Sequence, residues 1–442
     1  MPKTDPVSTL APPQSFFSKL RFLGPGFILS ASIVGSGELI ATTVLGAKAG
    51  FITFWVILVS CLIKVAVQLE FGKNAIISGR PLMQDFNSFR GWRIRNTNWM
   101  VWGTFVLTSF KILQLGGMLG GAAIALSLLF PQLPVALCAV ILGATLPYFF
   151  IKNYYSRIEK VSTTLVCGFT LFTLASFAAI FFTSYSFGLT ELSTGLTFQL
   201  PPELVFVAIG AFGITGVASD EIIAYTYWCQ EKGYARYLGP YEESPEWHAR
   251  AKGWIKVMHL DAFVAMGIYT LVTAAFYLLG AAILHGRERI PEGTDLVNTL
   301  AGIYTESLGS GARVGYLVGA FFALYSSVFA TLAYWTRLFP DIFVAAGWIA
   351  PQGLGKSVRF LALGLPLCWV LTFLFVKQPG VMVLFGGAVG SVLLLLTVYG
   401  GVVFFLRNQA LKLTPGKVYQ TVFWLSIASI LLVSGYGIFK LF

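Results

Sequence analysis

Residue types that rarely share the middle of an apolar segment stand together in the stretch SIVGSGELIA, Ser32 to Ala41. There Gly35, Ser36 and Glu38 interrupt an apolar run that extends from residue 22 to residue 47. Glycine and serine weaken a helix and free its backbone carbonyl groups, and the carboxylate adds a charged oxygen. Carbonyl and carboxylate oxygens are the ligands that hard cations prefer, so this stretch predicts cation chemistry.

A second interruption of the same kind lies in GAFGITGVASDEIIAYTYW, which begins at Gly210. Its glycines lower the helix propensity of the segment, and Thr215, Asp220 and Glu221 then supply oxygen atoms. Because Asp220 and Glu221 are adjacent, they project about 100° apart on a helix, and only one of them need face a shared site. The predicted substrate-binding or metal-binding residues are Gly35, Ser36, Glu38, Thr215, Asp220 and Glu221.

Both interruptions also have a purely structural explanation. Ser36 could cap a second half-helix, with Glu38 in its first turn, where the helix dipole favours negative charge. Ser219 and Asp220 could do the same in the second stretch. Capping and cation binding can coexist, so the two explanations stay open together.

The composition shows which elements must position these residues. The chain has 442 residues, of which 56% are hydrophobic and 11% charged, and its mean hydropathy is +0.77. A soluble protein of this length carries about 25% charged residues. Many apolar runs have the bilayer-spanning length of about 20 residues, which predicts a multi-pass membrane protein. The five cysteines form no CxxC pair, and the N-terminus has no short apolar region before a cleavage site, so we expect no disulfide, zinc site or cleaved signal peptide.

Proline, glycine and charge clusters separate eleven predicted spans. These lie near residues 22–47, 51–78, 99–129, 133–151, 160–183, 203–228, 254–284, 312–338, 358–376, 380–406 and 417–440. Of the 30 Lys and Arg residues, 22 fall in the N-terminus and every second loop, and 6 fall on the other side. This asymmetry predicts a cytoplasmic N-terminus and an external C-terminus in the cell membrane. The net charge of +11 is then a topology signal, so no nucleic-acid partner is expected.

The two interrupted segments are the first and the sixth predicted span. Irregular backbone survives at membrane depth where it is buried in protein or lines a cavity, and paired interruptions five spans apart are typical of inverted-repeat carriers. We therefore expect an all-α polytopic membrane protein with a LeuT-like inverted repeat of 5+5 helices plus one extra helix, helices 1 and 6 being broken. Residues 34–38 and 215–220 should be non-helical or helix-ending and face each other near the midplane. The expected organisation is a cytoplasmic tail over 1–21 and one transmembrane domain over 22–442, with repeats at about 22–183 and 203–406 and the extra helix at about 417–440.

Further ionisable residues in the predicted spans leave alternatives open. Lys64 and Glu70 are six residues apart and lie on different helical faces. Glu70 is either a coupling residue or part of an internal ion pair. Lys111 is either the structural partner of a carboxylate or a fixed positive charge that replaces a coupling ion. His259 and Asp261 fall at the start of the seventh span, where an interfacial position is expected.

Two stretches of the chain resemble the Nramp family of metal-ion transporters, within the amino acid–polyamine–organocation superfamily. The stretch LGPGFILSASIVGSGELIATTVLGAKAGF, Leu23 to Phe51, is similar to the family's G-P-G-F start of helix 1 and its A-x-x-G-[YF] entry to helix 2. The stretch QLEFGKNAIISGRPLMQDF, Gln68 to Phe86, is similar to the family's end of helix 2. Span count, orientation and broken helices extend the resemblance over most of the chain.

The departures from the family fall on its binding motifs. Residues 35–38, Gly-Ser-Gly-Glu, stand where the family has D-P-G-N, so glycine replaces the metal-binding Asp. When Gly216 and Tyr225 are aligned with the family, residues 220–222, Asp-Glu-Ile, stand near its M-P-H motif, so the soft Met ligand and the proton-linked His are missing. Hard oxygen ligands then favour magnesium, manganese or calcium over late transition metals.

The expected function is secondary active transport of a divalent metal cation, with magnesium or manganese favoured, by alternating access and with the proton as a candidate coupling ion. No cofactor is expected, and the lipid bilayer is the other partner. The alternative is a carrier of an amino acid, polyamine or other organic amine, because Glu38 and Asp220 would suit an amine. An enzyme is not expected: the chain has three histidines and no nucleophile–base pattern, and LGGMLGGAAIALS predicts close helix packing and not a phosphate loop.

Overall fold

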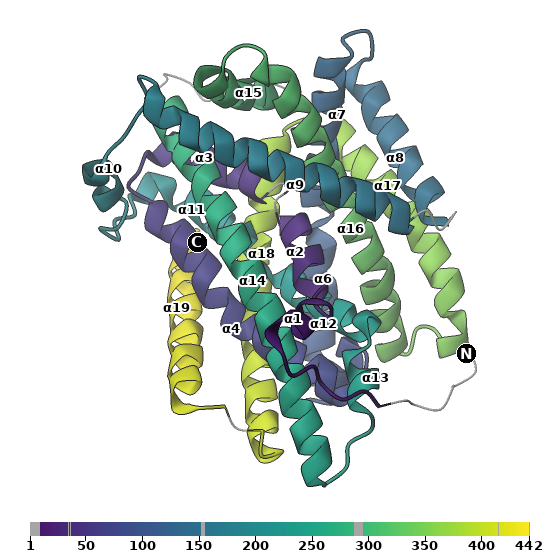
Figure 1. Cartoon of the computed structure of the whole chain (residues 1–442). Coiled ribbons are helices and arrows are strands. Elements are labelled where there is room, and N and C mark those ends of the chain that lie inside the picture. Colours follow the sequence, from purple (N-terminus) through teal and green to yellow (C-terminus); the bar gives the residue numbers. More distant parts are fainter. Residues whose placement is uncertain are drawn as a thin grey trace.

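The computed structural model describes residues 9–33, 35, 37–151, 155–286, 295–413 and 415–441. Eight segments of this part are long and apolar enough to cross a membrane, and two shorter apolar helices cover Val135–Phe150 and Val166–Phe182. They form one bundle in which most helices run lengthwise, while α9 lies obliquely across one side (Figure 1). Together with the broken first span, every predicted span corresponds to a helical segment.

The spans have the following bounds, in chain order. They are α2 Pro25–Ile33 with the π-helix η1 Gly37–Thr42 and α3 Thr43–Ala49, α4 Phe54–Ser78, α6 Trp99–Phe110 with α7 Ile112–Leu129, α8 Val135–Ile151, α9 Tyr155–Ala179 with the 3-10 turn η2 Ile180–Phe182, α11 Val205–Ile214 with α12 Ser219–Lys232, α14 Pro245–Leu284, α16 Ala312–Ala345, α17 Leu354–Val376, α18 Pro379–Ala410 and α19 Lys417–Leu441. Short elements connect them: α1 Phe16–Leu20, α5 Leu82–Asn87, β1 Arg93–Ile94, β2 Thr97–Asn98, α10 Leu189–Thr194, η3 Pro202–Leu204, α13 Tyr234–Leu238, α15 Asp295–Leu308 and η4 Pro351–Gly353.

The sixth span breaks where the sequence predicts it. Helix α11 ends at Ile214, residues 215–218 are unwound, and α12 begins at Ser219. Gly216 lies in this segment with a φ of +61°, a conformation that glycine adopts without steric cost. The prediction for 215–218 is therefore confirmed, and Ser219 and Asp220 form the first turn of the following helix.

The first span breaks over a shorter stretch than predicted. Helix α2 ends at Ile33, and Gly35 lies in a turn. Gly37 and Glu38 already belong to the π-helix, so the expectation of non-helical backbone up to residue 38 is wrong for these two residues. The reason is local: Gly35 O accepts an α-type hydrogen bond from Leu39 N–H at 3.0 Å, so backbone bonding resumes directly after the turn at Gly35. Val34 and Ser36 lie outside the described residues.

Three further details differ from the span prediction. The third span is interrupted at Lys111, whose N–H bonds to Thr108 O at 3.1 Å in a tighter turn between α6 and α7. Helices α14 and α16 are longer than their apolar cores. The connecting helix α15 and the β1–β2 hairpin were not predicted, because neither has the length or hydropathy of a span.

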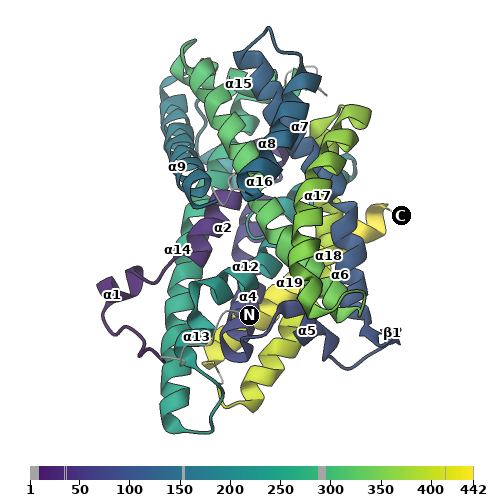
Figure 2. The same ribbon diagram turned by 90° about the vertical axis from the view of Figure 1, so that its right-hand side faces the viewer.

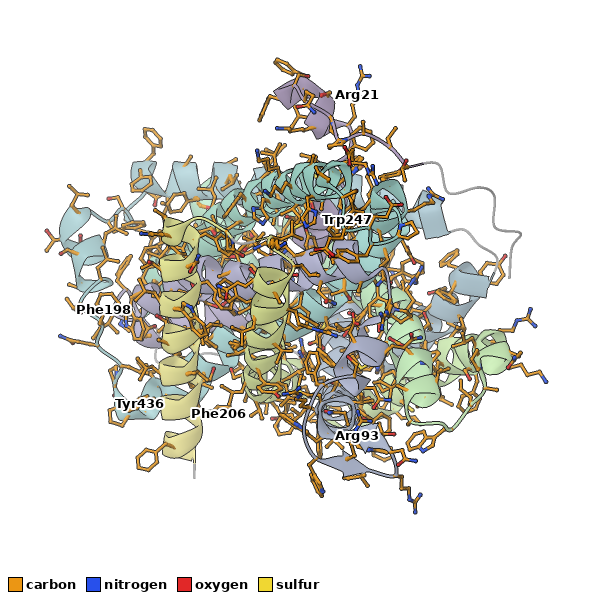
Figure 3. All side chains as sticks on the ribbon, turned by 90° about the horizontal axis from the view of Figure 1, so that it is seen from below. Arg21, Arg93, Phe198, Phe206, Trp247 and Tyr436 are labelled. Atoms are coloured by element: carbon orange, nitrogen blue, oxygen red, sulfur yellow. The ribbon has the colours of Figure 1, made fainter. Side chains whose placement is uncertain are left out.

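Large apolar side chains cover the outside of the bundle. Phe198, Phe206 and Tyr436 are 67%, 39% and 45% exposed, and Figure 3 shows them at the periphery, whereas Trp247 is fully buried. An exposed apolar surface of this kind fits contact with lipid. Figure 2, turned by 90°, shows α17, α18 and α6 together on one face of the bundle.

Glycines bring helix α11 into backbone contact with α18. A Cβ atom on Gly213 would collide with the carbonyl oxygen of Gly387, and one on Gly387 would collide with that of Gly210. Gly117 of α7 is similarly close to α18, since its Cβ would lie 2.8 Å from Met382 Cβ. The close packing predicted for the glycine-rich third span is therefore confirmed, and α18 supports the helix that ends at the break.

We predict that Gly213→Ala destabilises the protein. The added methyl group overpacks the α11–α18 contact, at a cost of about 1–3 kcal/mol, and should lower the thermal unfolding midpoint in detergent. Gly364→Ala in α17 is the matched control, because nothing lies within 4 Å of its Cβ position and alanine favours a helix. An unchanged or higher midpoint for Gly213→Ala would contradict the backbone contact described here.

Candidate substrate site at the two helix breaks

The break between α11 and α12 leaves backbone groups without helical partners. The last regular bond of α11 joins Thr215 N–H to Ala211 O at 2.9 Å. The carbonyl groups of Phe212 and Thr215 instead accept hydrogen bonds from Lys64 Nζ, at 2.7 and 2.6 Å. Ser60 Oγ lies 3.0 Å from the same two oxygens. Two residues of α4, one turn apart, therefore satisfy the carbonyl groups that the break exposes.

Glu38 satisfies the opposite kind of backbone group. Its Oε1 atom accepts hydrogen bonds from Gly216 N–H at 3.3 Å and from Thr273 Oγ1 of α14 at 3.0 Å. A Cβ on Gly37 would lie 2.9 Å from Ile214 O, so the two breaks adjoin each other as predicted. Glu38 is fully buried, and its Oε2 atom has no hydrogen-bond partner in the described part of the chain. This carboxylate oxygen is free to bind a cation.

The first turn of α12 adds two more carboxylates. Asp220 Oδ2 forms an ion pair with Lys111 Nζ, which reaches it from the turn between α6 and α7. Asp220 Oδ1 and Glu221 Oε2 are buried and have no hydrogen-bond partner among the described residues. Of the two roles left open for Lys111, the geometry shows the pairing with a carboxylate. That pairing leaves three carboxylate oxygens, one each on Glu38, Asp220 and Glu221, without partners.

Two small cavities adjoin Asp220 and Glu221, each of about 30 Å³. Gly37, Gln114 and Met118 line the first of them, and Gln114 Oε1 has no hydrogen-bond partner within the part of the chain that the structure describes. A cavity of this volume holds about one water molecule or one bare ion. Gln114 and Met118 were not predicted as site residues, because neither stands out in the glycine-rich third span.

Of the other residues predicted for the site, the two that the structure describes, Thr215 and Gly35, contribute no unpaired oxygen atoms. Thr215 donates its hydroxyl hydrogen to Ser60 Oγ at 2.9 Å and so faces α4. The Gly35 carbonyl is engaged by the π-helix, and Ser36 lies outside the described residues. Lys64 and Thr273 were missed as partners of the breaks. The spacing of Ser60 and Lys64, four residues apart in an apolar span, was the signal that could have identified one of them.

Glu70 lies in a separate, fully bonded cluster. Its Oε1 accepts hydrogen bonds from Lys73 Nζ and Tyr419 Oη, both at 2.6 Å, and its Oε2 accepts one from Asn408 at 3.1 Å. The structure therefore shows the internal ion pair, one of the two roles left open for this residue. Glu70 does not contact the groups at the breaks.

Asp261 anchors the start of α2. Its carboxylate accepts hydrogen bonds from Gly24 N–H at 2.8 Å and Gly26 N–H at 2.5 Å, and from Tyr225 Oη at 3.0 Å. The interfacial depth of this residue stays a prediction, but its side chain lies inside the protein, because it is 1% exposed. The physical reason is the helix N-terminus, whose free N–H groups attract a carboxylate into the protein.

The described residues contain no group of three or more His, Cys, Asp or Glu side chains close enough to hold a metal ion. In the described residues, the carboxylates at the breaks do not converge on one point, and Lys111 occupies Asp220 through an ion pair. A divalent cation that binds here must draw them together and compete with Lys111 for Asp220.

Comparison with known proteins identifies a family that this chain resembles. A family model described as natural resistance-associated macrophage protein-like (Nramp) matches residues 26–440. The divalent metal cation transporter MntH of Staphylococcus saprophyticus is 26% identical over 319 residues, which cover 70% of this chain and 65% of that protein. The transporter of the same name from Yersinia pestis is 26% identical over 390 residues, covering 82% and 88%. The match spans 65% of the length of the first three relatives.

Solved structures share the fold. The Eremococcus coleocola manganese transporter, in complex with an aromatic bis-isothiourea substituted compound, has a TM-score of 0.73 at 16% identity, with 98% of this chain and 89% of that chain covered. Mhp1, a nucleobase-cation-symport-1 family transporter in a closed conformation with bromovinylhydantoin bound, has a TM-score of 0.56 at 13% identity, with 99% and 95% covered. These likenesses confirm the LeuT-like architecture expected from the sequence.

The ion pair between Lys111 and Asp220 yields a stability prediction. Lys111→Met leaves Asp220 without its partner and should destabilise the protein by about 3–5 kcal/mol. The double variant Lys111→Met/Asp220→Leu removes both charges and should recover most of that loss. A double-mutant cycle of denaturant unfolding in detergent measures the coupling. Additive losses, with no recovery in the double variant, would show that the two groups do not interact in solution.

Proposed function

The chain belongs to the Nramp-like family, and on that premise we propose that it carries a divalent metal cation across a membrane by alternating access. The relatives are named as divalent metal cation transporters, which supports a transporter over an enzyme. The observation that carries the proposal is Glu38: a fully buried carboxylate at the junction of the two breaks, with one oxygen unpaired. An intramembrane carboxylate is costly unless it serves a function.

The proposed ligands are oxygen atoms. Glu38 Oε2, Asp220 and Glu221 supply the carboxylate oxygens. This set suits magnesium or manganese. Lys111 is the coupling candidate, because an incoming cation must displace its ammonium group from Asp220. A proton lost from Lys111 as the metal binds would link metal movement to proton movement. The fully bonded cluster around Glu70 supports a structural role there.

The proposed orientation follows the distribution of basic residues, with the N-terminus in the cytoplasm and the C-terminus outside the cell membrane. The tail over 1–21 would then be cytoplasmic. We assign the repeats to about 22–183 and 203–406, because the breaks in the first and sixth spans occupy equivalent positions, and treat α19 as the additional helix.

Transport of an organic amine is the second candidate, and one observation favours it. Lys64 and Lys111 offset two of the three carboxylate charges of Glu38, Asp220 and Glu221. A site with a net charge near −1 suits a monovalent ammonium group better than a bare divalent ion. Metal uptake into proteoliposomes, with amines as competitors, separates the two candidates. Amine uptake without any divalent metal uptake would replace the first proposal by the second.

Glu38→Gln tests the proposed metal ligand. Glutamine keeps the carbonyl oxygen that accepts the hydrogen bonds from Gly216 and Thr273, so the fold should persist. The lost charge weakens attraction for a divalent ion, and the apparent dissociation constant should rise by about tenfold or more. Metal uptake into proteoliposomes and calorimetric binding measure the effect. Glu191→Gln, on the exposed helix α10, is the matched control.

Asp220→Asn should resemble Glu38→Gln if both carboxylates bind one ion, and the double variant should be no worse than the more impaired single variant. A capping role alone would cost about 0.5–2 kcal/mol of stability and leave transport near normal. Full transport by both single variants would therefore reject the site.

Ion selectivity forms a separate prediction. Oxygen ligands should let magnesium or manganese compete well with cadmium. Met118 lines the adjoining cavity, so Met118→Leu should weaken any residual cadmium binding and leave magnesium binding unchanged. Competition binding experiments, measured by calorimetry, test these predicted relative affinities. Tight cadmium binding that persists in Met118→Leu, with no response to magnesium or manganese, would contradict a hard-oxygen site.

A further inference from the structure

We propose that Lys64 is a built-in cation that fills a carbonyl-lined monovalent cation site at the break between α11 and α12. The site rests on geometry alone, and its consequence for transport rests on the proposed function. Lys64 is fully buried at the centre of the apolar helix α4, where a charged ammonium group is costly. Its surroundings show what compensates that cost.

Oxygen atoms without formal charge surround the ammonium group. Lys64 Nζ lies 2.7 Å from Phe212 O and 2.6 Å from Thr215 O, and the Phe212 ring centroid lies 5.0 Å away. Ser60 Oγ bonds to the same two carbonyl groups and accepts a hydrogen bond from Thr215. Backbone carbonyls, a hydroxyl and the negative end of a half-helix together form the environment that binds a dehydrated monovalent cation.

The other buried lysines have a different kind of partner from Lys64. Among the described residues, the buried lysines are Lys64, Lys73 and Lys111. Lys73 pairs with Glu70, and Lys111 pairs with Asp220. Lys64 forms no ion pair with a described carboxylate; its hydrogen bonds go to carbonyl groups of the break, while Glu221 and Glu38 attract its charge at longer range. That is how a protein holds an alkali cation, whereas a structural ion pair uses a carboxylate.

The consequence is an internal substitute for a dissolved coupling ion. Because the tethered ammonium group fills the carbonyl site permanently, the break keeps its hydrogen bonds without sodium or potassium. Wild-type stability and transport should then be independent of which monovalent cation is present. Removal of the ammonium group should convert the same carbonyl groups into a site for an external cation.

Lys64→Ala tests this conversion through chemical rescue. Thermal unfolding of the purified full-length variant is measured in detergent with choline, which is too large for the site, and then with sodium, potassium, ammonium or methylammonium. In choline, the unfolding midpoint should fall by about 5 °C or more relative to wild type. At least one small cation should restore half or more of this loss in a saturable manner, while wild type responds to none.

Leu69→Ala, on the same helix, is the matched control. It also creates a cavity at a buried position but exposes no carbonyl group, so its midpoint should be equally low in every salt. Lys64→Met fills the volume without a charge and should remain unstable in all salts, because the two carbonyl groups stay unsatisfied.

Each other outcome overturns the proposal. Equal instability of Lys64→Ala in every salt, including failure to purify it with ammonium or potassium present, would show that no cation site exists. Wild-type stability of Lys64→Met would show that the ammonium group only fills space. These readouts do not depend on the substrate: wild type that fails to carry a divalent metal would remove the proposed function and leave the Lys64 result standing. Uptake by Lys64→Ala that becomes dependent on the rescuing cation would extend the inference to transport.

Discussion

Backbone polar groups inside a membrane must find hydrogen-bond partners within the protein. The unwound segment at residues 215–218 is where this requirement is hardest to meet, because unwinding frees several N–H and C=O groups at once. Each unsatisfied group would cost several kcal/mol there. The chain meets the demand with two buried charges of opposite sign from different helices. Glu38 accepts from the freed N–H of Gly216, and Lys64 donates to the freed carbonyl groups of Phe212 and Thr215. The break is therefore stable only when the first, second and sixth spans pack together.

The rest of the bundle holds these helices in position. Gly213 and Gly387 let α11 and α18 touch through their backbones, which fixes the end of the half-helix. Asp261 of α14 anchors the start of α2, and Thr273 of the same helix bonds to Glu38. One long helix thus supports both the start of the first span and its break. The cavities of about 30 Å³ beside the carboxylates each leave room for one small ion.

The proposed chemistry depends on the balance between the carboxylates and the lysines around the two breaks. The sixth span carries two carboxylates, Asp220 and Glu221, beside its break, and Lys111 of the third span pairs with the first of them. Lys111 engages a carboxylate and can be displaced by a cation, whereas Lys64 engages carbonyl groups and fills their site. These two buried lysines therefore have separate roles, one in competition with the substrate and one in place of a second ion.

Sequence alone determined the membrane class, the spans and the positions of both breaks, because hydropathy and glycine interruptions are local properties of the chain. It also identified Glu38 and Asp220, since a carboxylate within an apolar run is conspicuous without any fold. Tertiary structure decided which groups meet: Lys64 reaches carbonyls about 150 residues away, and Lys111 reaches a carboxylate about 110 residues away. Helix packing brings these pairs together, and no pattern within one span records a partner on another. For the same reason the sequence left Glu70 open as a coupling residue, although its partners on α18 and α19 saturate it.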